Sequence, residues 1–375
     1  MIKRLAAKVN TIMSQPVAGD RLLRLETLLL LLSKVYGAVV KARLACHQGK
    51  KLKSKTLPCF VISVGNITAG GTGKTPMTIY VAALVRQMGY RVAVISRGYR
   101  GKYEESGGVV CDGRRICCTP EESGDEPYLI AQTLGVPVLA GKDRYTLGMK
   151  AIREFNSQVI VLDDAFQHIQ LKRDLDLVLL DAGNPFGNGA LIPRGRLREP
   201  VSSLERCDAM VLTRCDPKEC NPPDVDHYMG KKPVLRTFHY PYILNVVNTS
   251  GQKLGKRSAQ DFYKKKCKKK GLLFSGIANN RDFRITCETM GMGVVGHLEF
   301  PDHYWYKAED IALLLDRYKE TEADFIVTTQ KDYVKIAEQF IIPRYLVVVG
   351  VAIKFMGNHG EAFESLIKDS IKSKR

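Results

Sequence analysis

Residues 57–99 read LPCFVISVGNITAGGTGKTPMTIYVAALVRQMGYRVAVISRGY, and their pattern sets the architecture of the chain. The apolar run Cys59–Val64 predicts a buried strand, a glycine-rich turn follows, and an apolar-periodic helix then extends to about Met88. Gly89 is well placed to end that helix. Strand, glycine turn, Gly73-Lys74-Thr75 and helix together predict a phosphate cradle, because backbone N–H groups and the helix N-terminus both favour an anion.

The predicted nucleotide-binding loop is a run of eight consecutive residues: Thr68, Ala69, Gly70, Gly71, Thr72, Gly73, Lys74 and Thr75. Lys74 can reach the β- and γ-phosphates of a nucleotide, and the Thr75 hydroxyl can hold Mg²⁺. The strict phosphate-loop pattern has a glycine five residues before Gly73, where this chain has Thr68, so one position of the pattern fails. The alternative is a glycine-rich turn with a chance Gly-Lys-Thr, but the flanking strand and helix favour nucleotide binding.

The bulk composition is that of a globular protein with a strongly basic charge. The chain has 375 residues, which suits two domains, and 57 basic against 39 acidic side chains give a formal net charge of +18. Such an excess predicts a negatively charged partner, which is nucleic acid, an anionic membrane or a phosphorylated substrate. The ten cysteines show neither C-x-x-C pairs nor zinc-finger spacing, which indicates reduced cytosolic thiols.

Residues 1–56 form a separate N-terminal segment built on one strongly apolar helix between Leu22 and Val40. Its longest stretch without a charge, Thr27–Ser33, has only seven residues, whereas a membrane-spanning helix needs about 20 apolar residues. We therefore expect it not to cross a bilayer. Basic residues follow it up to Lys55, and an apolar helix with a basic flank favours the surface of an anionic membrane. The alternative is a helix packed on the protein's own core.

From Leu57 onward, short apolar strands alternate with helices, which predicts a parallel sheet covered by helices on both faces. We predict an α/β fold of the P-loop NTPase type for residues 57–222 and a smaller α/β domain for residues 223–375. Ligands of such sheets bind beyond the carboxyl ends of the strands. The glycine loop, Arg97, Asp163 and Asp181 all follow predicted strands, so we expect them to converge.

Two further clusters of basic residues stand out. Arg194, Arg196 and Arg198 lie in a loop rich in glycine and proline, and three arginines on one irregular loop suit a phosphate clamp. The alternative for them is a role in solubility. Lys264–Lys270 holds six lysines in seven residues, which favours a solvated face over a second contact with anionic lipid.

Two pairs of neighbouring carboxylates are the candidates for metal binding and for a catalytic base. Asp163 and Asp164 end a predicted strand beside the glycine loop, where one carboxylate usually holds Mg²⁺. Asp125 and Glu126 begin a predicted helix, so they either cap it or divide two tasks, one aimed at an acceptor hydroxyl and one at the metal. His303 is an ordinary polar histidine on its own, but across a cleft from Asp125 it could orient that base.

Taken together, the motifs resemble one family, the tetraacyldisaccharide 4′-kinases of lipid A synthesis. The matching segments follow each other in family order: Val64–Pro76, Ser96–Tyr99, Gly124–Pro127, Lys142–Arg144, Asp163–His168, Phe186–Gly189, Leu197–Pro200, Phe300–His303 and Lys331-Asp332. The family tolerates a residue other than glycine at the start of its phosphate loop, which accounts for Thr68.

The resemblance implies transfer of the ATP γ-phosphate to the 4′-hydroxyl of tetraacyldisaccharide 1-phosphate, which gives lipid IVA. It implies a Mg²⁺-dependent enzyme on the cytoplasmic face of the bacterial inner membrane. Carried over by position, Asp125 is the expected base with His303 as its partner, and Lys74, Asp163 and Asp164 complete the catalytic set. Thr75 and Glu126 are the expected metal ligands. The residues expected to bind substrate are Arg97, Tyr99, Arg144, Gln167, His168 and Arg198.

The chain departs from the family at Ala165, where glycine is usual, and at Gln330, where glutamate is usual. Because of the second departure we assign no role to Lys331-Asp332. One rival interpretation is a membrane-bound nucleotide switch of the MinD type, but Ala69 stands where its signature lysine should be. The other is a nucleic-acid binder, which has the charge but no recognisable reading motif. We expect a monomer that does not bind nucleic acid.

Overall fold

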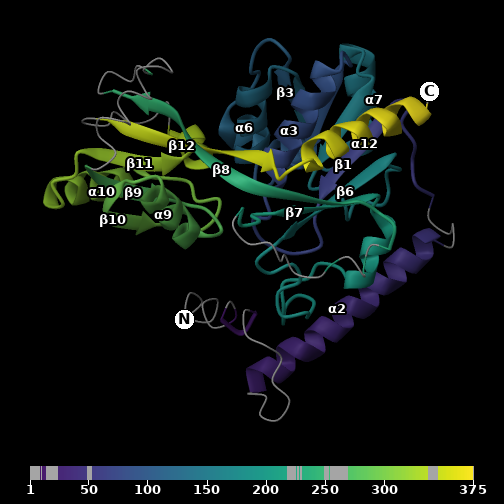
Figure 1. The fold of residues 1–375 in the computed structure, drawn as a ribbon, viewed down its shortest axis with the longest axis horizontal. Helices are drawn as coiled ribbons and strands as arrows, with labels where there is room; N and C mark the ends of the chain where they lie inside the picture. The colour runs from purple at the N-terminus through teal and green to yellow at the C-terminus, as the bar shows by residue number, and fades with distance from the viewer. Residues whose placement is uncertain are drawn as a thin grey trace.

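The computed structural model describes residues 9, 11–13, 24–48, 53–217, 225, 228, 230–248, 253, 269–336 and 345–374. Within these ranges, a continuous sheet of 12 strands runs through the molecule in the order β10-β9-β11-β12-β8-β7-β6-β1-β5-β2-β4-β3 (Figure 1). Alternate residues of β1 (Phe60–Gly65) enter apolar cores on opposite faces of this sheet. The prediction of a mostly parallel sheet covered by helices is confirmed.

The larger half of the sheet is parallel apart from one edge strand. The parallel strands beside β1 are β2 (Val92–Ser96), β4 (Pro137–Ala140), β5 (Val159–Asp163), β6 (Leu175–Asp181) and β7 (Ala209–Thr213). The edge strand β3 (Gly108–Asp112) pairs antiparallel with β4. Near-continuous Val, Ile and Leu in these strands fits a sheet buried on both faces.

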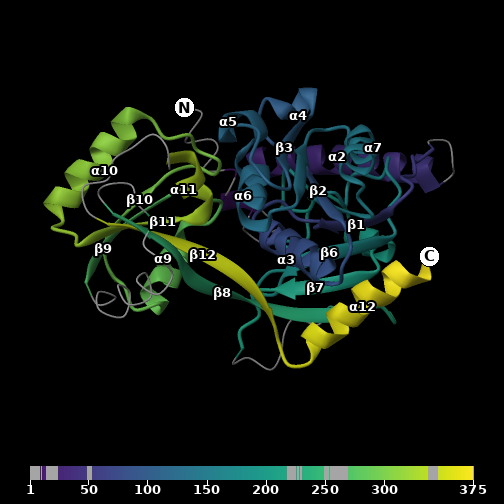
Figure 2. The ribbon, with the colours of Figure 1, turned by 90° about the horizontal axis from the view of Figure 1, so that it is seen from above.

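The smaller half of the sheet is joined to the larger half by two long strands. β8 (Val234–Val247) pairs in parallel with β7 at its start and antiparallel with β12 (Leu346–Phe355) along most of its length (Figure 2). The remaining strands are β9 (Lys270–Ser275), β10 (Gly293–Glu299) and β11 (Phe325–Thr329), and they pair in parallel.

The helices cover the sheet or border the site. They are α2 (Arg24–Gln48), α3 (Lys74–Gln87), α4 (Tyr103–Ser106), α5 (Pro120–Ser123), α6 (Asp125–Leu134), α7 (Arg144–Phe155), α9 (Asn280–Thr289), α10 (Ala308–Glu320), α11 (Gln330–Ile336) and α12 (His359–Ser373). A 3₁₀ turn spans Val201–Arg206.

The C-terminal helix α12 returns from the smaller half to the larger one (Figure 1). Its apolar residues Phe363, Ile367 and Ile371 are buried in the same core as β1 and α3. The predicted boundary between residues 222 and 223 stays a prediction. Of the lysine cluster Lys264–Lys270, residues 264–268 lie outside the described residues.

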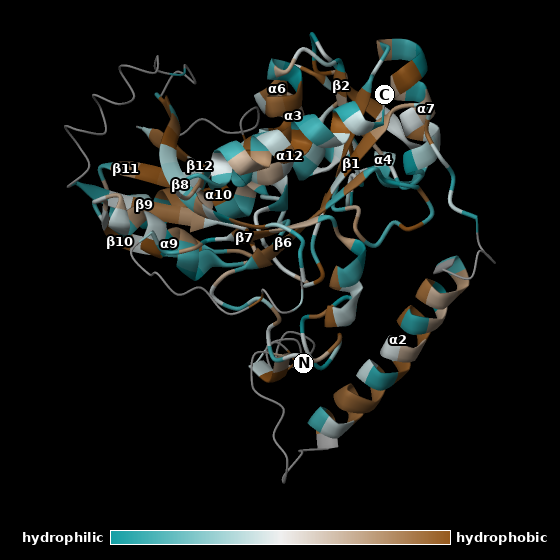
Figure 3. Ribbon diagram, turned by 45° about the vertical axis from the view of Figure 1, so that its right-hand side comes forward, coloured by the Kyte–Doolittle hydropathy of each residue, from teal (hydrophilic) through white to brown (hydrophobic). Residues whose placement is uncertain are grey.

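Helix α2 lies along the outside of the larger half and carries many hydrophobic residues (Figure 3), of which Leu28, Leu31, Leu32, Val35 and Val39 are exposed. Its inner face is fixed by side-chain bonds to the body: Ser33 Oγ donates to the Leu191 carbonyl (2.7 Å) and the Tyr36 hydroxyl donates to the Arg198 carbonyl (2.9 Å). In the described part of the chain, none of the helices combines the length and hydrophobicity needed to span a membrane.

We expect Phe363→Ala to lower the free energy of unfolding by about 3–5 kcal/mol, because a fully buried aromatic ring leaves a cavity when it is removed. Phe363 is 0% exposed and lies 4.8 Å from the Phe355 ring, centroid to centroid. Urea denaturation followed by circular dichroism measures the change. The control is Lys368→Ala on the exposed side of the same helix, which should change stability by less than about 0.5 kcal/mol. Equal effects of the two variants would mean that α12 does not hold the larger half together.

Candidate functional site

The carboxyl ends of five parallel strands meet at one edge of the larger half. The glycine loop follows β1, Arg97 follows β2, Asp163 ends β5, Asp181 ends β6 and Arg214 follows β7. Neighbouring strands in the order β7-β6-β1-β5-β2 place these positions side by side. The structure therefore brings together the strand ends that were expected to converge.

The phosphate loop is held in shape from both sides. Thr68 forms a bridge with Leu197, and the Ala69 N–H donates to the Arg196 carbonyl at 2.7 Å, so the arginine-containing loop lies directly against it. Within the loop, Asn66 Nδ2 donates to the Thr72 hydroxyl at 2.9 Å. Gly73 caps α3 with a φ of 82°, a backbone conformation that is costly for residues with a Cβ. Such a fixed loop at a helix N-terminus is suited to an anion.

Two cationic side chains, Lys74 and Arg198, contact Asp164. Lys74 Nζ lies 3.8 Å from its carboxylate, and Arg198 Nη1 donates to both of its oxygens at 3.0 Å. Burial works to raise the pKa of Asp164, but Lys74 and Arg198 outweigh it and lower that pKa below its usual value. The predicted residues Lys74, Asp164 and Arg198 thus form one ion-pair cluster.

Asp163 has a different environment. It is 1% exposed, and among the described residues its carboxylate accepts hydrogen bonds from two hydroxyl groups, of Thr78 at 2.8 Å and Ser96 at 3.0 Å. Burial and then the nearby carboxylates of Glu126 and Asp164 raise the pKa of Asp163 to about 7. Neither Thr78 nor Ser96 was among the predicted site residues.

Asp125 and His303 come together from opposite halves of the molecule. His303 Nδ1 lies 3.0 Å from each carboxylate oxygen of Asp125, although the two residues are 178 positions apart. Burial favours a higher pKa for Asp125, but His303, Lys331 and Lys335 together hold it well below its usual range. The carboxylate is therefore ionised at neutral pH. His303 itself has a φ of 58°, and the Tyr99 ring packs edge-on against its ring at 5.4 Å.

Two glycines let the loops around this pair approach each other. A Cβ on Gly98 would lie 2.8 Å from the Ser123 carbonyl, and a Cβ on Gly124 would lie 3.0 Å from the Tyr99 carbonyl. Both glycines also have positive φ. The contact places Tyr99 beside the start of α6, where Asp125 lies. Arg97 in the same loop donates from Nε to Glu104 at 2.8 Å and keeps an exposed side chain.

The other predicted substrate residues are Arg144, Gln167 and His168. Arg144 is 3% exposed, and one of its guanidinium nitrogens donates to the Gly141 carbonyl. Burial lowers the pKa of Arg144 to about 10, so it stays protonated at neutral pH. Gln167 Nε2 donates to the Asn66 carbonyl at 2.7 Å. Burial and then Arg144 lower the pKa of His168 to about 4, which leaves that ring neutral.

Further residues at the site had no role predicted from the sequence. Lys331 and Lys335 of α11 contact Asp125 at 3.8 and 3.5 Å. Arg214 Nη1 bonds to Asp181 at 2.6 Å and lies 3.6 Å from Asp282 of α9. His239 Nε2 lies 2.8 Å from where a Cβ on Gly73 would be, and among the described residues it has no hydrogen-bond partner. The signal in the sequence was the family match at Lys331-Asp332, which could not show what the Lys331 side chain faces.

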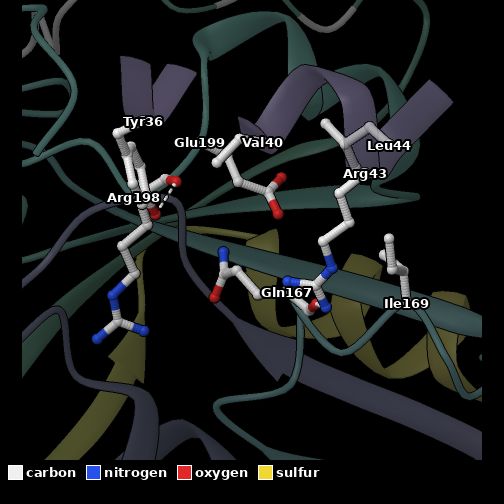
Figure 4. Close-up of a pocket in the computed structure, with 8 residues that line it drawn as sticks. All are labelled: Tyr36, Val40, Arg43, Leu44, Gln167, Ile169, Arg198 and Glu199. Atoms are coloured by element: carbon white, nitrogen blue, oxygen red, sulfur yellow. Dashed lines mark hydrogen bonds between the residues drawn. The ribbon is translucent and has the colours of Figure 1, made fainter. Parts of the chain in front are cut away.

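A small pocket opens between α2 and the site (Figure 4). Its lining combines side chains of α2 with loops that also carry predicted substrate residues: Tyr36, Val40, Arg43, Leu44, Gln167, Ile169, Arg198 and Glu199. Arg43 Nη2 donates to the Gln167 carbonyl at 3.0 Å across it. The pocket volume is about 30 Å³, which is room for a water molecule or two.

The carboxylate and hydroxyl groups of the site fit Mg²⁺ binding when a phosphate ligand supplies the remaining oxygen atoms. In the part of the chain that the structure describes, no three His, Cys, Asp or Glu side chains converge enough to hold a metal ion alone. Mg²⁺ is usually bound by one or two carboxylates together with water and substrate phosphates. The raised pKa of Asp163 near Glu126 and Asp164 shows negative charge that a divalent cation would neutralise.

Comparison with known proteins gives one consistent family. The model of the family described as tetraacyldisaccharide-1-P 4′-kinase (LpxK) matches residues 25–372. A tetraacyldisaccharide 4′-kinase of Desulfatibacillum aliphaticivorans is 37% identical over 347 residues, which cover 91% of this chain and 92% of that protein. The corresponding kinase of Syntrophus aciditrophicus is 38% identical over 359 residues, covering 92% and 93%.

A solved structure agrees with the sequence comparison. The crystal structure of LpxK from Aquifex aeolicus in complex with ATP superimposes with a TM-score of 0.72 at 30% identity, and the match covers 92% of this chain and 99% of that one. The fold, the ordered motifs and these relatives lead to one conclusion: the chain belongs to the tetraacyldisaccharide 4′-kinase family of ATP-dependent phosphotransferases.

Proposed function

We propose that the chain binds ATP in the phosphate loop and that Asp125 receives the proton of the acceptor 4′-hydroxyl. The observation that carries this proposal is the contact of the buried Asp125 with the partly buried His303 at 3.0 Å, at the same edge of the sheet as the phosphate loop. An ionised carboxylate held by a histidine is suited to orient a hydroxyl and accept its proton. The rival nucleotide switch and nucleic-acid binder do not account for such a pair.

The reaction balances without a further reactant. The acceptor oxygen forms a bond to the γ-phosphorus, the bond from that phosphorus to the β–γ bridging oxygen breaks, and ADP leaves. The acceptor proton passes to Asp125. Lys74 lies 3.8 Å from Asp164 at the start of α3, where its ammonium group can stabilise charge that spreads over the transferred phosphoryl group.

Metal binding would use residues at both helix starts. Thr75 of α3 and Glu126 of α6 are the proposed ligands, and Asp163 and Asp164 lie near enough to Lys74 and Glu126 for their charges to interact. When bound, Mg²⁺ supplies a positive charge that screens the phosphates. The hydroxyls of Thr78 and Ser96 orient the Asp163 carboxylate. The cations of Lys74 and Arg198 orient the Asp164 carboxylate.

The lipid disaccharide would approach from the side of α2. The pocket lined by Tyr36, Arg43 and Arg198 joins this helix to the site, and the side chains of Arg97 and Tyr99 are exposed to solvent. We propose that Arg97, Tyr99, Arg144, Gln167, His168 and Arg198 contact the phosphorylated sugar. The pocket holds only about 30 Å³, so entry of a sugar requires α2 or the loops to shift.

The outer face of α2 is the proposed contact with the anionic cytoplasmic face of the inner membrane. Leu28, Leu31, Leu32, Val35 and Val39 are between 47% and 62% exposed. They follow helical spacing and form one stripe. Opposite this stripe, Ser33 and Tyr36 fix the helix to the body. An apolar stripe on a bound helix in a chain of net charge +18 suits an anionic leaflet.

We expect Asp125→Asn to lower kcat by roughly 10²- to 10⁴-fold while ATP affinity stays nearly unchanged, because a base acts on the transition state. Turnover is measured with labelled ATP and tetraacyldisaccharide 1-phosphate, and ATP affinity by calorimetry. Asp316→Asn, at an exposed position of α10, is the control and should behave as the parent. Full turnover by Asp125→Asn would remove this residue from its proposed role.

Lys74→Ala should weaken ATP binding and also slow turnover. We expect ATP affinity to fall by roughly 10- to 100-fold, as when a charge-assisted hydrogen bond worth about 1.5–3 kcal/mol is lost, and kcat to fall as well. The same two measurements apply, with the exposed Lys319→Ala as the control. Unchanged ATP affinity would place the triphosphate away from this loop.

Replacing Leu31, Val35 and Val39 by serine should release the protein from membranes. Each large apolar side chain that leaves a lipid phase costs about 1.5–3 kcal/mol, so we expect vesicle binding to fall by more than tenfold. Co-sedimentation with phosphatidylglycerol vesicles measures this, and the control is Ile285→Ser with Leu313→Ser, which are 48% and 47% exposed elsewhere. Equal loss of binding in both variants would show that the α2 stripe has no special role.

A further inference from the structure

The two lysines of α11 form a second layer behind the proposed base. Lys331 and Lys335 belong to the segment TTQKDYVK, which the sequence left without a role. α11 packs on the start of α6 through Val334, which contacts Tyr128 and Leu129 in a small apolar cluster. Gln330 Nε2 also donates to the Thr133 hydroxyl at 3.3 Å. The helix is therefore fixed to the same element that carries Asp125.

Lys331 is the point where four polar groups meet. Its Nζ lies 3.3 Å from His303 Nε2, 3.4 Å from Asp302, 3.6 Å from Glu126 and 3.8 Å from Asp125. The side chain is 19% exposed. Lys335 is fully buried and is itself held between Asp125, at 3.5 Å, and Asp332, at 3.3 Å. Asp332 is fixed in turn by the Gly276 N–H at 3.0 Å and the Thr329 hydroxyl at 2.7 Å.

These contacts determine which ring nitrogen of His303 carries the proton. A lysine ammonium has only donors, so at 3.3 Å from Lys331 the ring nitrogen Nε2 acts as the acceptor and is unprotonated. The proton then resides on Nδ1, which faces both oxygens of Asp125 at 3.0 Å. The competing acceptor for an Nε2 proton is Asp302, whose carboxylate lies farther away, at 3.8 Å.

We propose that Lys331 is a positioning residue, which holds His303 in its Nδ1–H tautomer by donating a hydrogen bond to Nε2. In that form His303 donates to Asp125 and leaves the carboxylate free to accept the hydroxyl proton. Lys335, held by Asp332, fixes the other side of the same carboxylate. This inference rests on the proposed role of Asp125 and His303, and it adds a residue that acts through His303.

The test is the ¹⁵N spectrum of the His303 ring in the full chain without nucleotide or metal. Long-range ¹H–¹⁵N spectra are compared for the parent protein, Lys331→Met and Lys331→Arg, and His303→Gln assigns the signals. We expect a protonated Nδ1 and an unprotonated Nε2 in the parent and in Lys331→Arg. Lys331→Met should lose this pattern, and its kcat should fall by roughly tenfold or more while KM for ATP changes less than about twofold.

Several outcomes would overturn the inference. A protonated Nε2 in the parent protein does so directly and does not depend on any variant folding. The parent pattern and parent kcat in Lys331→Met do so as well, as does failure of Lys331→Arg to restore the pattern. Lys319→Met, exposed on α10, is the matched control and should leave spectrum and turnover unchanged. Full activity of Asp125→Asn would instead defeat the proposed base while the tautomer of His303 still stood.

Discussion

Negative charge gathered at one edge of the sheet is the constraint on which the rest of the site depends. Asp125 and Glu126 lie at the start of α6, Asp163 and Asp164 lie at the end of β5, and two of the four, Asp125 and Asp163, are almost completely buried. Buried carboxylates are costly unless they are paired or hydrogen-bonded. The cations that form ion pairs with these carboxylates come from several elements: Lys74 from α3, Arg198 from the arginine-containing loop, and Lys331 and Lys335 from α11.

This constraint explains why the two halves of the molecule must meet. Asp125 lies in the larger half, but its histidine and both of its ammonium groups lie in the smaller half. β8 and β12 run antiparallel from one half to the other, and ten pairs of facing residues join the two strands. The return of α12 to the core of β1 then closes the chain on itself. The sheet thus holds the cations of the smaller half beside Asp125.

The larger half could be predicted because its signals are local. β1, the glycine loop and α3 are adjacent in the chain, and apolar periodicity marks each of them. β8 was not predicted: its residues alternate weakly between buried and half-buried positions, and Pro241 interrupts the pattern. Its position in the sheet is set by pairing with β12, more than a hundred residues later. Such pairing leaves no trace in a local pattern.

The same distinction holds for the site. Lys74, Asp163 and Asp164 could be identified from their place after predicted strands, and the Asp125–His303 pair was expected mainly from the family resemblance. Lys331 matched a family motif but was given no role because Gln330 departs from that motif, and nothing in the sequence singled out Lys335. Only the packing of α11 on α6 removes these two lysines from solvent and directs them at Asp125. A substitution such as Gln330 for glutamate does not remove this packing, since Gln330 still bonds to Thr133.

The two buried aspartates at the site lie in different electrostatic environments, and this difference supports the different roles proposed for them. Asp125 is surrounded by a histidine and two ammonium groups, which lower its pKa and keep it ionised. Asp163 is held by hydroxyl groups and faces other carboxylates, and burial with that repulsion raises its pKa to about 7. The first arrangement keeps a carboxylate ready to accept a proton from a hydroxyl that approaches it. The second gathers carboxylates whose charge a divalent cation bound with nucleotide would balance, which supports the proposal that nucleotide lies beside Asp163 and the acceptor beside Asp125.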